Sequence, residues 1–401
     1  MSSMETNTPL VTGMESTAMA SEGTASCANR PEPGSPADYP QPLVSVVMPV
    51  RDQERVLRQT LESVLAQSLE NFELVLVDDG STDGSPGIER EFADRDPRAR
   101  LFPREAQGAG PARNFGLGRA RGRYVIFLDS DDLFHPDLLL DMASVLEATG
   151  ADVCVCEADT FDGEGEMKPY IRFGRLKEGL YPRHVLGRHL FQVGPGSAWN
   201  NMYRRDFLLG TGILFQDLKN SNDSTFTDLT MLKAEKIYLL KGPLVFYRQG
   251  LGTSIQDTKR EYPFEALKAA EKLFYEAHER HYLSPSVETG LRMRCASLLA
   301  STAESLIAMQ TYDESTHERL AVCLQHWGSM GAPHTTSELK AVMKAGLIKH
   351  ATYEKAVWAN THWKQKVRCH TPLEKLDYSL RIIIAVALSN FPPDMSRHPR
   401  K

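Results

Sequence analysis

The sequence predicts an α/β fold built on a parallel sheet, followed by a mainly helical C-terminal region. Three apolar runs rich in β-branched and aromatic residues support this prediction, at residues 43–50, 72–77 and 124–128. A stretch with helical spacing separates the first two runs, and neighbouring parallel strands need such a crossover. The last two runs end in carboxylates. In a parallel sheet these acids would meet at the carboxyl edge, where open α/β folds bind ligands.

The first strand is expected at residues 43–50 (LVSVVMPV), where the apolar run indicates a buried strand. A helix is expected from Glu54 to Ala66, because its apolar side chains recur near helical spacing. They are Val56, Leu57, Leu61, Val64 and Leu65. The second strand, residues 72–77, leads directly into the polar turn 78–83 (DDGSTD). This strand-helix-strand pattern predicts a parallel sheet.

The third strand, residues 124–128, is followed by three carboxylates within four residues, Asp129, Asp131 and Asp132. Such a concentration of negative charge requires a cation. Because side chains alternate along an extended chain, Asp129 and Asp131 could lie on one side and share a hard divalent ion, Mn²⁺ or Mg²⁺. The alternative is that these acids cap a helix starting near His135, which would account for only one of them.

The chain divides into three predicted regions. Residues 1–41 are rich in Ser, Thr, Pro and Gly without an apolar period, which predicts a disordered leader. Residues 42–255 are predicted to form the α/β domain. Residues 256–401 are predicted to form a mainly helical domain, because apolar residues keep helical spacing over 264–277 and 287–299.

Composition narrows the function and the compartment. The net charge of −6 provides no electrostatic argument for a nucleic acid partner. The six cysteines have neither zinc-ligand spacing nor the density of a disulfide framework, which favours a reducing cytoplasm. No secretory signal is visible, and no apolar stretch reaches the roughly 18 residues that a spanning helix needs.

The end of the chain is basic. The last forty residues hold eight basic and three acidic side chains, a balance of 8 − 3 = +5. Peripheral contact with the anionic inner face of a membrane is one interpretation. A solvated tail beside an ordinary helix is the other.

Three segments, taken in order, resemble a known family. They are VSVVMPV at 44–50, LESVLAQSLENFELVLVDDGSTDGS at 61–85 and GAGPARNFGLGRARGRYVIFLDSDD at 108–132. Together they are similar to the inverting family 2 glycosyltransferases of GT-A fold, the Rossmann-like fold of nucleotide-diphospho-sugar transferases. The likeness covers residues 43 to 150 and continues more weakly to about residue 255.

The resemblance implies roles for the acids at the strand ends. Asp131 stands where the family's D-x-D motif has its second acid, the direct ligand of Mn²⁺ or Mg²⁺. Asp129 would hold the ribose, or the metal through water. Asp79 would accept a hydrogen bond from the uracil or ribose of the donor, with Pro49 lining the base pocket. The alternative for Asp79 is a turn stabilised by Asx-type hydrogen bonds.

Two basic segments join this predicted site. Arg113 and Asn114 match the family's A-R-N segment, which lies near the nucleotide. Arg113 stands where a G-x-G-x-x-G fingerprint needs its third glycine, which argues against a Rossmann dehydrogenase. Arg248 matches a Tyr-Arg segment after the last core strand, and is expected to reach the diphosphate from a loop that Gly250 and Gly252 make mobile.

An inverting transfer also needs a carboxylate base for the acceptor hydroxyl. Residues 221–226 (SNDSTF) resemble the family's E-D-x-x-F motif, in which Asp223 would be the base and Asn222 replaces the Glu. This replacement should lower the basicity of Asp223, because a neighbouring like charge favours the protonated acid. The alternative is that Asp223 is the N-cap of the following helix, with Asp217 and Asp228 as other candidate bases.

The predicted function is therefore metal-dependent, inverting transfer of a hexose or N-acetylhexosamine from a UDP-sugar. The expected acceptor is a glycan, a lipid-linked sugar or a polyol phosphate in surface polysaccharide synthesis. Trp199 would be an acceptor-stacking platform or a core aromatic residue. One alternative is a degenerate transferase-like module that only binds nucleotide sugars, with Asn222 as a sign of decay. A sugar-phosphate nucleotidyltransferase is disfavoured, since residues 51–54 (RDQE) lack a glycine-rich loop.

Overall fold

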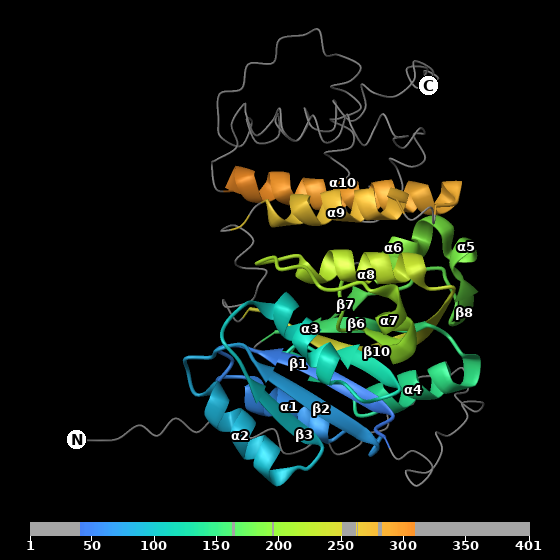
Figure 1. The fold of residues 1–401 in the computed structure, drawn as a ribbon. Coiled ribbons are helices and arrows are strands. Elements are labelled where there is room, and N and C mark those ends of the chain that lie inside the picture. The colour runs from blue at the N-terminus through green and yellow to red at the C-terminus, as the bar shows by residue number, and fades with distance from the viewer. Residues whose placement is uncertain are drawn as a thin grey trace, which may run out of the picture.

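The computed structural model describes residues 41–162, 165–194, 196–250, 262, 264–279 and 283–308. Within these ranges the strands form one mixed sheet with the order β3-β2-β1-β4-β9-β6-β10-β5, while β7 pairs with β6 and β8 with β10. Helices cover both faces of the sheet (Figure 1). Nearly all of the predicted leader, the glycine loop at 251–260 and the basic tail lie outside the described residues.

The three predicted strands correspond to β1, β2 and β4, and the predicted first helix to α1. The strands are β1 (Val44–Val50), β2 (Phe72–Asp78), β3 (Ala99–Pro103), β4 (Tyr124–Phe127), β5 (Leu133–Phe134), β6 (Val153–Phe161), β7 (Met167–Ile171), β8 (Gly179–Pro182), β9 (Asn201–Arg204) and β10 (Lys236–Arg248). The helices are α1 (Leu57–Leu65), α2 (Ser85–Arg95), α3 (Ala109–Arg119), α4 (Leu138–Thr149), α5 (Arg183–Leu186), α6 (Leu190–Val193), α7 (Arg205–Thr211), α8 (Asn222–Lys233), α9 (Glu265–Glu279) and α10 (Pro285–Ala308), with a 3-10 turn η2 (Gly187–His189).

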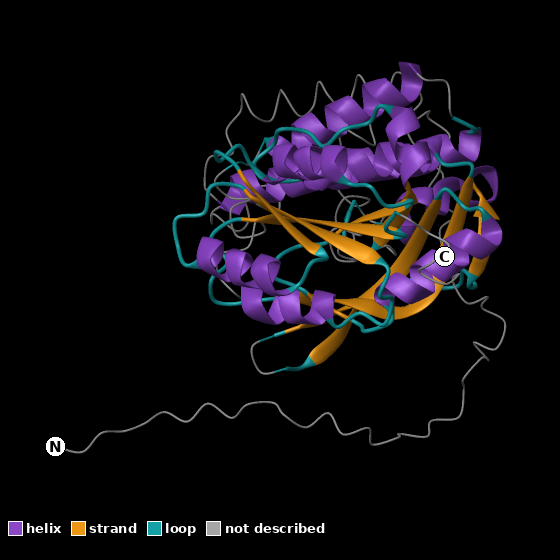
Figure 2. Cartoon of the chain, turned by 60° about the horizontal axis from the view of Figure 1, so that its bottom comes forward, coloured by secondary structure: helices purple, strands orange, loops and turns teal. Residues whose placement is uncertain are grey.

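The first half of the sheet is parallel, as predicted. β1 lies between β2 and β4 and is parallel to both, and β2 is parallel to β3. β9 then runs antiparallel between β4 and β6. Figure 2 shows the strands fanning out between the helical layers. The carboxyl ends of β1, β2 and β4 therefore lie side by side at one edge.

Successive residues of the central strands face opposite hydrophobic clusters, which explains why the sequence shows continuous apolar runs. One cluster, against α1 and α4, contains Val46, Leu74 and Ile126. The other, against α3 and α8, contains Val47, Val75 and Phe127. A Cβ on Gly116 would lie 2.4 Å from Cγ1 of Val47, so this glycine lets α3 lie close against β1.

The C-terminal helices extend the second cluster. In Figure 1, α9 and α10 lie over α8 on the side away from the sheet. Leu267, Phe274 and Leu291 of these helices share a buried core with Phe226 of α8. The helical character predicted over 264–277 and 287–299 is thus confirmed by α9 and α10. None of the helices in the described ranges has the length and apolar character needed to cross a bilayer.

A buried carboxylate fastens the amino-terminal edge of the sheet, opposite the predicted site. Glu73 is 1% exposed and accepts hydrogen bonds from Ser45 Oγ (2.7 Å), Arg121 N–H (2.6 Å) and Arg100 Nη1 (2.7 Å). Burial alone would raise the pKa of Glu73, but these donors more than offset it and hold the pKa below its ordinary value. Glu73 thereby joins β1, β2, β3 and the start of β4.

We expect Glu73→Gln to lower the free energy of unfolding by about 3 kcal/mol at neutral pH, because three donors, one of them fully buried, lose a charged acceptor. A depressed pKa contributes stability above the unfolded-state pKa, and this stability is lost as pH falls through the folded-state pKa. The difference between variant and parent should therefore shrink between about pH 7 and about pH 3. Urea unfolding at both pH values measures this. The exposed Glu70→Gln serves as control, and equal stability of E73Q and E70Q would refute the role of Glu73.

Candidate active site

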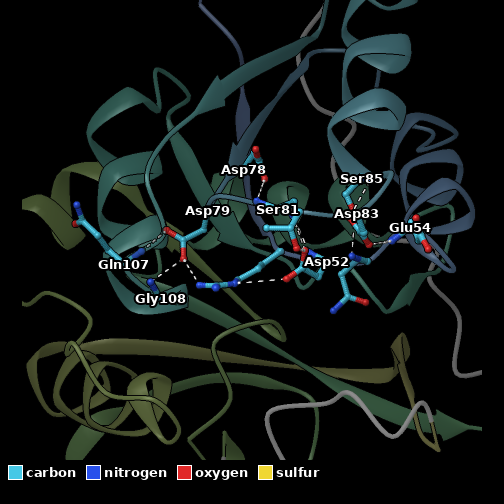
Figure 3. A network of polar contacts seen from close by, with 12 residues as sticks. Asp52, Glu54, Asp78, Asp79, Ser81, Asp83, Ser85, Gln107 and Gly108 are labelled. Carbon is cyan, nitrogen blue, oxygen red and sulfur yellow. Dashed lines mark hydrogen bonds and ion pairs between the residues drawn. The ribbon is translucent and has the colours of Figure 1, made fainter.

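The loops after β1 and β2 hold each other in place and form a rigid rim at the carboxyl edge (Figure 3). Asp52 Oδ1 accepts the N–H of Thr82 at 2.7 Å, and the N–H of Asp52 donates to Ser81 Oγ at 3.1 Å. The N–H of Gly84 donates to Glu54 Oε2 at 2.7 Å. Asp52 has a φ of +51°, which is uncommon for a residue with a Cβ. The reciprocal bonds compensate for that strain and fix the rim.

Asp79 follows β2 and ties this rim to the start of α3. Its oxygens accept the N–H groups of Gln107 at 3.0 Å and Gly108 at 2.6 Å, toward which it points in Figure 3. The Asx-type turn belongs instead to Asp78, whose Oδ1 accepts the N–H of Ser81 at 2.9 Å. Arg104 Nε lies 3.5 Å from Oδ1 and Arg51 Nη1 3.9 Å from Oδ2, so two positive charges also face this buried carboxylate. Pro49 lies buried near the end of β1 beside it.

Beyond β4 the three acids of residues 129–132 leave the sheet as a tight turn. Asp132 is fully buried, and its Oδ1 accepts the N–H of Arg248 at 2.9 Å. Burial, with the charge of Asp129, raises the pKa of Asp131 to about 6. Burial and both neighbouring acids raise the pKa of Asp132 well above its ordinary value. The turn therefore concentrates negative charge that the protein alone leaves incompletely balanced.

The capping alternative for these acids is wrong. Helix α4 begins at Leu138, and Asp137 precedes it without a side-chain cap bond. Asp129 instead pairs with an arginine on α3, and the backbone of Asp132 accepts a bond from Thr60 Oγ1 at 2.8 Å. The acids are thus held at the sheet edge by contacts from other elements.

Arg113 joins the β4 end to the start of α8. This side chain is 4% exposed, and its Nη2 lies 2.5 Å from Asp129 Oδ1 while its Nη1 donates to Asn222 Oδ1 at 2.8 Å. Burial by itself would lower the pKa of Arg113, but Asp129 and Asp223 more than offset this and raise it. Arg113 is therefore a permanent positive charge among the acids.

A close approach of two segments makes this bridge possible. A Cβ on Gly110 would lie 2.2 Å from the carbonyl oxygen of Gln216, so the glycine lets α3 touch the loop before α8. Asn114 closes the same joint, because its side chain donates to Phe215 C=O and accepts from Phe215 N–H, both at 2.9 Å. The Asn114 side chain thus holds the backbone of the loop before α8 against α3.

Asp223 is the second residue of α8. The residue before the helix is Ser221, which has a φ of +57° and makes no side-chain cap bond, so the N-cap alternative for Asp223 is wrong. Burial raises the pKa of Asp223, Arg113 opposes the rise, and Asp129 adds to it. Asp223 therefore combines partial exposure with an environment that favours uptake of a proton.

The other two candidate bases are less suited. Asp228 is fully buried, and its Oδ2 accepts from Arg294 Nε of α10 at 2.7 Å. Burial raises the pKa of Asp228 to about 6 despite this pairing. Asp217 is exposed in the loop before α8. Asp228 thus anchors α8 to α10 instead of facing the sheet edge.

The expectation that Arg248 lies in a mobile loop is wrong. This arginine is the last residue of β10, so it lies on a strand. Its Nε donates to the carbonyl of Asp131 at 2.8 Å and its Nη2 to Gln59 Oε1 at 2.8 Å. Arg248 therefore holds the acidic turn at Asp131 and Asp132, while Arg113 holds it at Asp129.

Two parts of the site have no role assigned from the sequence. Asp132 stands in the predicted acidic run, but the run does not indicate that it is buried and accepts the N–H of Arg248. Tyr170 of β7 and Tyr247 of β10 stack with Trp199 near the acids, and no local motif marks Tyr170. Trp199 is 5% exposed, so it is the ring of this stack that belongs to the core.

The acids fit a divalent ion that is bound together with a substrate. Within the described residues, no group of three His, Cys, Asp or Glu side chains forms a complete metal site. Asp131 and Asp129 nevertheless repel each other, as the raised pKa of Asp131 shows. Mg²⁺ and similar ions often use one or two carboxylates and complete their shell with water and substrate phosphates. Asp131 and Asp129 match that donor set.

Residues 45–209 match the sequence model of the Glycosyl transferase family 2. The chain carries a family 2 glycosyltransferase domain. It is 32% identical to EpsH of Bacillus subtilis over 222 residues, which is 54% of this chain and 63% of EpsH. It is 30% identical to the minor teichoic acid biosynthesis protein GgaA of the same organism over 217 residues, 52% of this chain and 47% of GgaA. The match spans less than two thirds of either relative.

The fold of the glycosyltransferase domain is also shared with a solved structure. Residues 1–349 of Staphylococcus aureus TarS, crystallised with UDP-GlcNAc, superpose with a TM-score of 0.60. The superposition covers 81% of this chain and 93% of TarS 1–349 at 20% identity. The predicted GT-A fold is thereby confirmed.

We expect Arg113→Lys to lower the free energy of unfolding by about 2 kcal/mol, although it preserves the charge. A single ammonium group cannot reach both Asp129 and Asn222 as the guanidinium fork does. Arg113→Ala should cost roughly 3 kcal/mol, because it leaves buried polar groups unpaired. Chemical denaturation measures both. Arg119→Lys, an exposed position on the same helix, is the matched control. A stability of R113K equal to that of R119K would contradict the bridge.

Proposed function

We propose that this chain is an inverting, metal-dependent glycosyltransferase that moves a hexose or N-acetylhexosamine from a UDP-sugar to a surface-polymer acceptor. The observation that carries the proposal is the convergence of Asp131, Asp129, Arg113 and Asp223 at one sheet edge. TarS was crystallised with UDP-GlcNAc, which supports a UDP-linked donor. The name of GgaA includes minor teichoic acid biosynthesis, which supports a glycan, lipid-linked or polyol-phosphate acceptor.

In the proposed reaction an acceptor hydroxyl attacks the anomeric carbon of the donor sugar from the face opposite the diphosphate. The new C–O bond forms as the anomeric C–O bond to phosphate breaks, and UDP departs with the electron pair. A Mn²⁺ or Mg²⁺ ion held by Asp131, with Asp129, would supply a Lewis acid for the charge on the diphosphate. The proton of the acceptor hydroxyl goes to Asp223.

Asp223 is suited to this proton transfer because burial raises its pKa toward the operating range of a general base. Nη1 of Arg113 donates a hydrogen bond to the side-chain oxygen of Asn222, which carries no charge. A Glu at residue 222 would place a second negative charge beside Asp223 and make it harder to ionise. The asparagine therefore weakens Asp223 as a base but leaves it ionised over a wider pH range.

The nucleoside is proposed to lie along the rim formed by the loops after β1 and β2. Asp79 would accept from uracil or ribose, and Pro49 would line the base position. Arg113 and Asn114 set the position of α3 next to it. Arg248 fixes the turn that presents Asp131 and places a positive charge beside the acids. We also propose a cytoplasmic location, with peripheral contact at the inner face of the membrane.

Donor binding should stabilise the protein only when Asp131 is intact. With UDP-GlcNAc at 100 times its dissociation constant and Mn²⁺ present, the parent should gain about 2.7 kcal/mol, and Asp131→Asn should gain much less. A thermal shift series with and without chelator measures this. Asp206→Asn, exposed on α7, is the control and should respond like the parent. If no UDP compound raises the parent's Tm with metal, the donor assignment is wrong.

Asp223→Asn should reduce kcat by about 10²- to 10⁴-fold, because the amide cannot accept the proton. In the parent, kcat should fall as pH drops through the Asp223 pKa. Because that pKa is raised, the loss should occur at higher pH than for an ordinary Asp. Asn222→Glu should move the acidic limb to still higher pH.

The rates of transfer and of slow metal-dependent UDP-sugar hydrolysis test these expectations. Asp217→Asn identifies the base, since loss of activity in D217N with full activity in D223N would reassign it. A parent that binds UDP-sugar but catalyses neither reaction would be a binding module instead of an enzyme.

A further inference from the structure

Three aromatic rings from different elements lie nearly parallel beside the acids. Tyr170 comes from β7, Trp199 precedes β9, and Tyr247 comes from β10. The ring centroids of Trp199 and Tyr247 lie 5.8 Å apart with an interplanar angle of 3°. Those of Tyr170 and Tyr247 lie 5.5 Å apart at 16°, and those of Tyr170 and Trp199 6.3 Å apart at 19°. We call these three rings the aromatic platform.

The platform is graded from core to surface. Trp199 is 5% exposed and belongs to the hydrophobic cluster against α1 and α4. Tyr247 is partly buried and packs against the same cluster. Tyr170 is 46% exposed and is the outermost ring. The buried Trp199 and the partly buried Tyr247 thus hold an exposed ring in a fixed orientation, which lowers the entropic cost of using it for binding.

A local irregularity directs Tyr170. Ala158 pairs with Ile171 and Asp159 pairs with Pro169, so Tyr170 is the extra residue on β7. Such bulges re-aim a side chain and are over-represented beside active sites. In a regular ladder Tyr170 would oppose a residue of β6. The bulge instead frees it to join Tyr247, which lies on the other neighbour of β6.

The platform lies next to the reacting groups of the proposed site. Burial raises the pKa of Tyr170, and the negative charges of Asp223 and Asp132 raise it further. Burial, Asp132 and Tyr170 act in the same direction on the pKa of Tyr247. Tyr247 also directly precedes Arg248, whose N–H donates to Asp132 Oδ1 at 2.9 Å and whose Nε donates to the carbonyl of Asp131 at 2.8 Å, so the rings lie beside the acidic turn. The same acids would repel an acceptor phosphate group that is not bound to the metal ion.

We propose that Tyr170, supported by Trp199 and Tyr247, is the platform on which an uncharged pyranose ring of the acceptor stacks. This inference rests on the proposed glycosyltransferase function and names the acceptor class, a glycan in place of a bare polyol phosphate. The C–H face of a pyranose packs on an aromatic ring, while its rim of hydroxyl groups stays available for hydrogen bonds. A ring seated on Tyr170 would have a hydroxyl near Asp223 to attack the donor.

Saturation-transfer NMR on the full chain tests the platform without requiring turnover. The probes are the methyl β-glycosides of glucose, galactose and N-acetylglucosamine, with glycerol 3-phosphate as the charged comparison. Each is measured with and without UDP and Mn²⁺. At least one glycoside should bind through its ring C–H protons. Tyr170→Ala should weaken that binding about tenfold, and Tyr170→Phe should retain it, since the aromatic face is kept.

Two further variants guard against trivial explanations. Tyr275→Ala, on α9, removes a tyrosine of similar exposure, 44%, and should bind like the parent. Tyr170→Leu keeps apolar bulk without an aromatic face and should lose binding as Tyr170→Ala does, even if the alanine variant folds poorly. Binding of a glycoside equally by Y170L and the parent would overturn the platform. So would the absence of binding by every glycoside, or Tyr170-dependent binding of glycerol 3-phosphate.

The failure of this inference is separable from the failure of the proposed function. Stabilisation by UDP-GlcNAc and Mn²⁺ reports on the donor site alone. A parent that is stabilised by the donor but binds glycosides independently of Tyr170 would keep its proposed function and lose the platform. A parent that binds glycosides through Tyr170 without any response to UDP compounds would keep the platform as a sugar site and lose the proposed donor.

Discussion

The site depends on one buried cation between two loops that are far apart in the sequence. Arg113 contacts Asp129 with one nitrogen and Asn222 with the other, and in doing so sets the distance between the acidic turn and the start of α8. Without a charge at this position, Asp129, Asp131 and Asp223 would repel one another across a partly desolvated space, where such repulsion is strongest. The guanidinium is suited to this position because it spans two partners and stays protonated.

The parallel half of the fold was predictable because its physics is local. Strands β1, β2 and β4 are buried on both faces, so each appears as a largely apolar run, interrupted only by Ser45 in β1 and by Glu73 and the terminal Asp78 in β2, and α1 shows the expected period. Helix α1 starts at Leu57, three residues later than predicted, because residues 51–56 are committed to the rim. Strands β7 and β8 were not predicted. Their exposed, mixed sequences pair only because β6 and β10 provide edges for them.

The candidate site was predictable only as a set of residues. The motifs identified Asp79, Arg113, Asp131 and Asp223, but their partners lie from 16 to 117 positions away in the chain, such as Asp129 and Asn222 for Arg113, Gly108 for Asp79 and Arg248 for Asp131. Arg248 illustrates the limit. Its neighbouring glycines suggested a loop, whereas tertiary pairing with β6 continues strand β10 to that residue. Contacts of this kind depend on packing between elements, which no local pattern encodes.

The ion pair between Asp228 and Arg294 has a wider consequence for how the two halves of the chain depend on each other. The first turn of helix α8 places Asp223 at the sheet edge. About one and a half turns later, Asp228 of the same helix pairs with Arg294 of α10. A shortened chain ending near residue 255 would leave the Asp228 carboxylate and the apolar back of α8 facing water. Helices α9 and α10 thus support the helix that carries the proposed base. If the C-terminal helices were exchanged between related transferases, activity should be preserved only where the ion pair between Asp228 and Arg294 is kept.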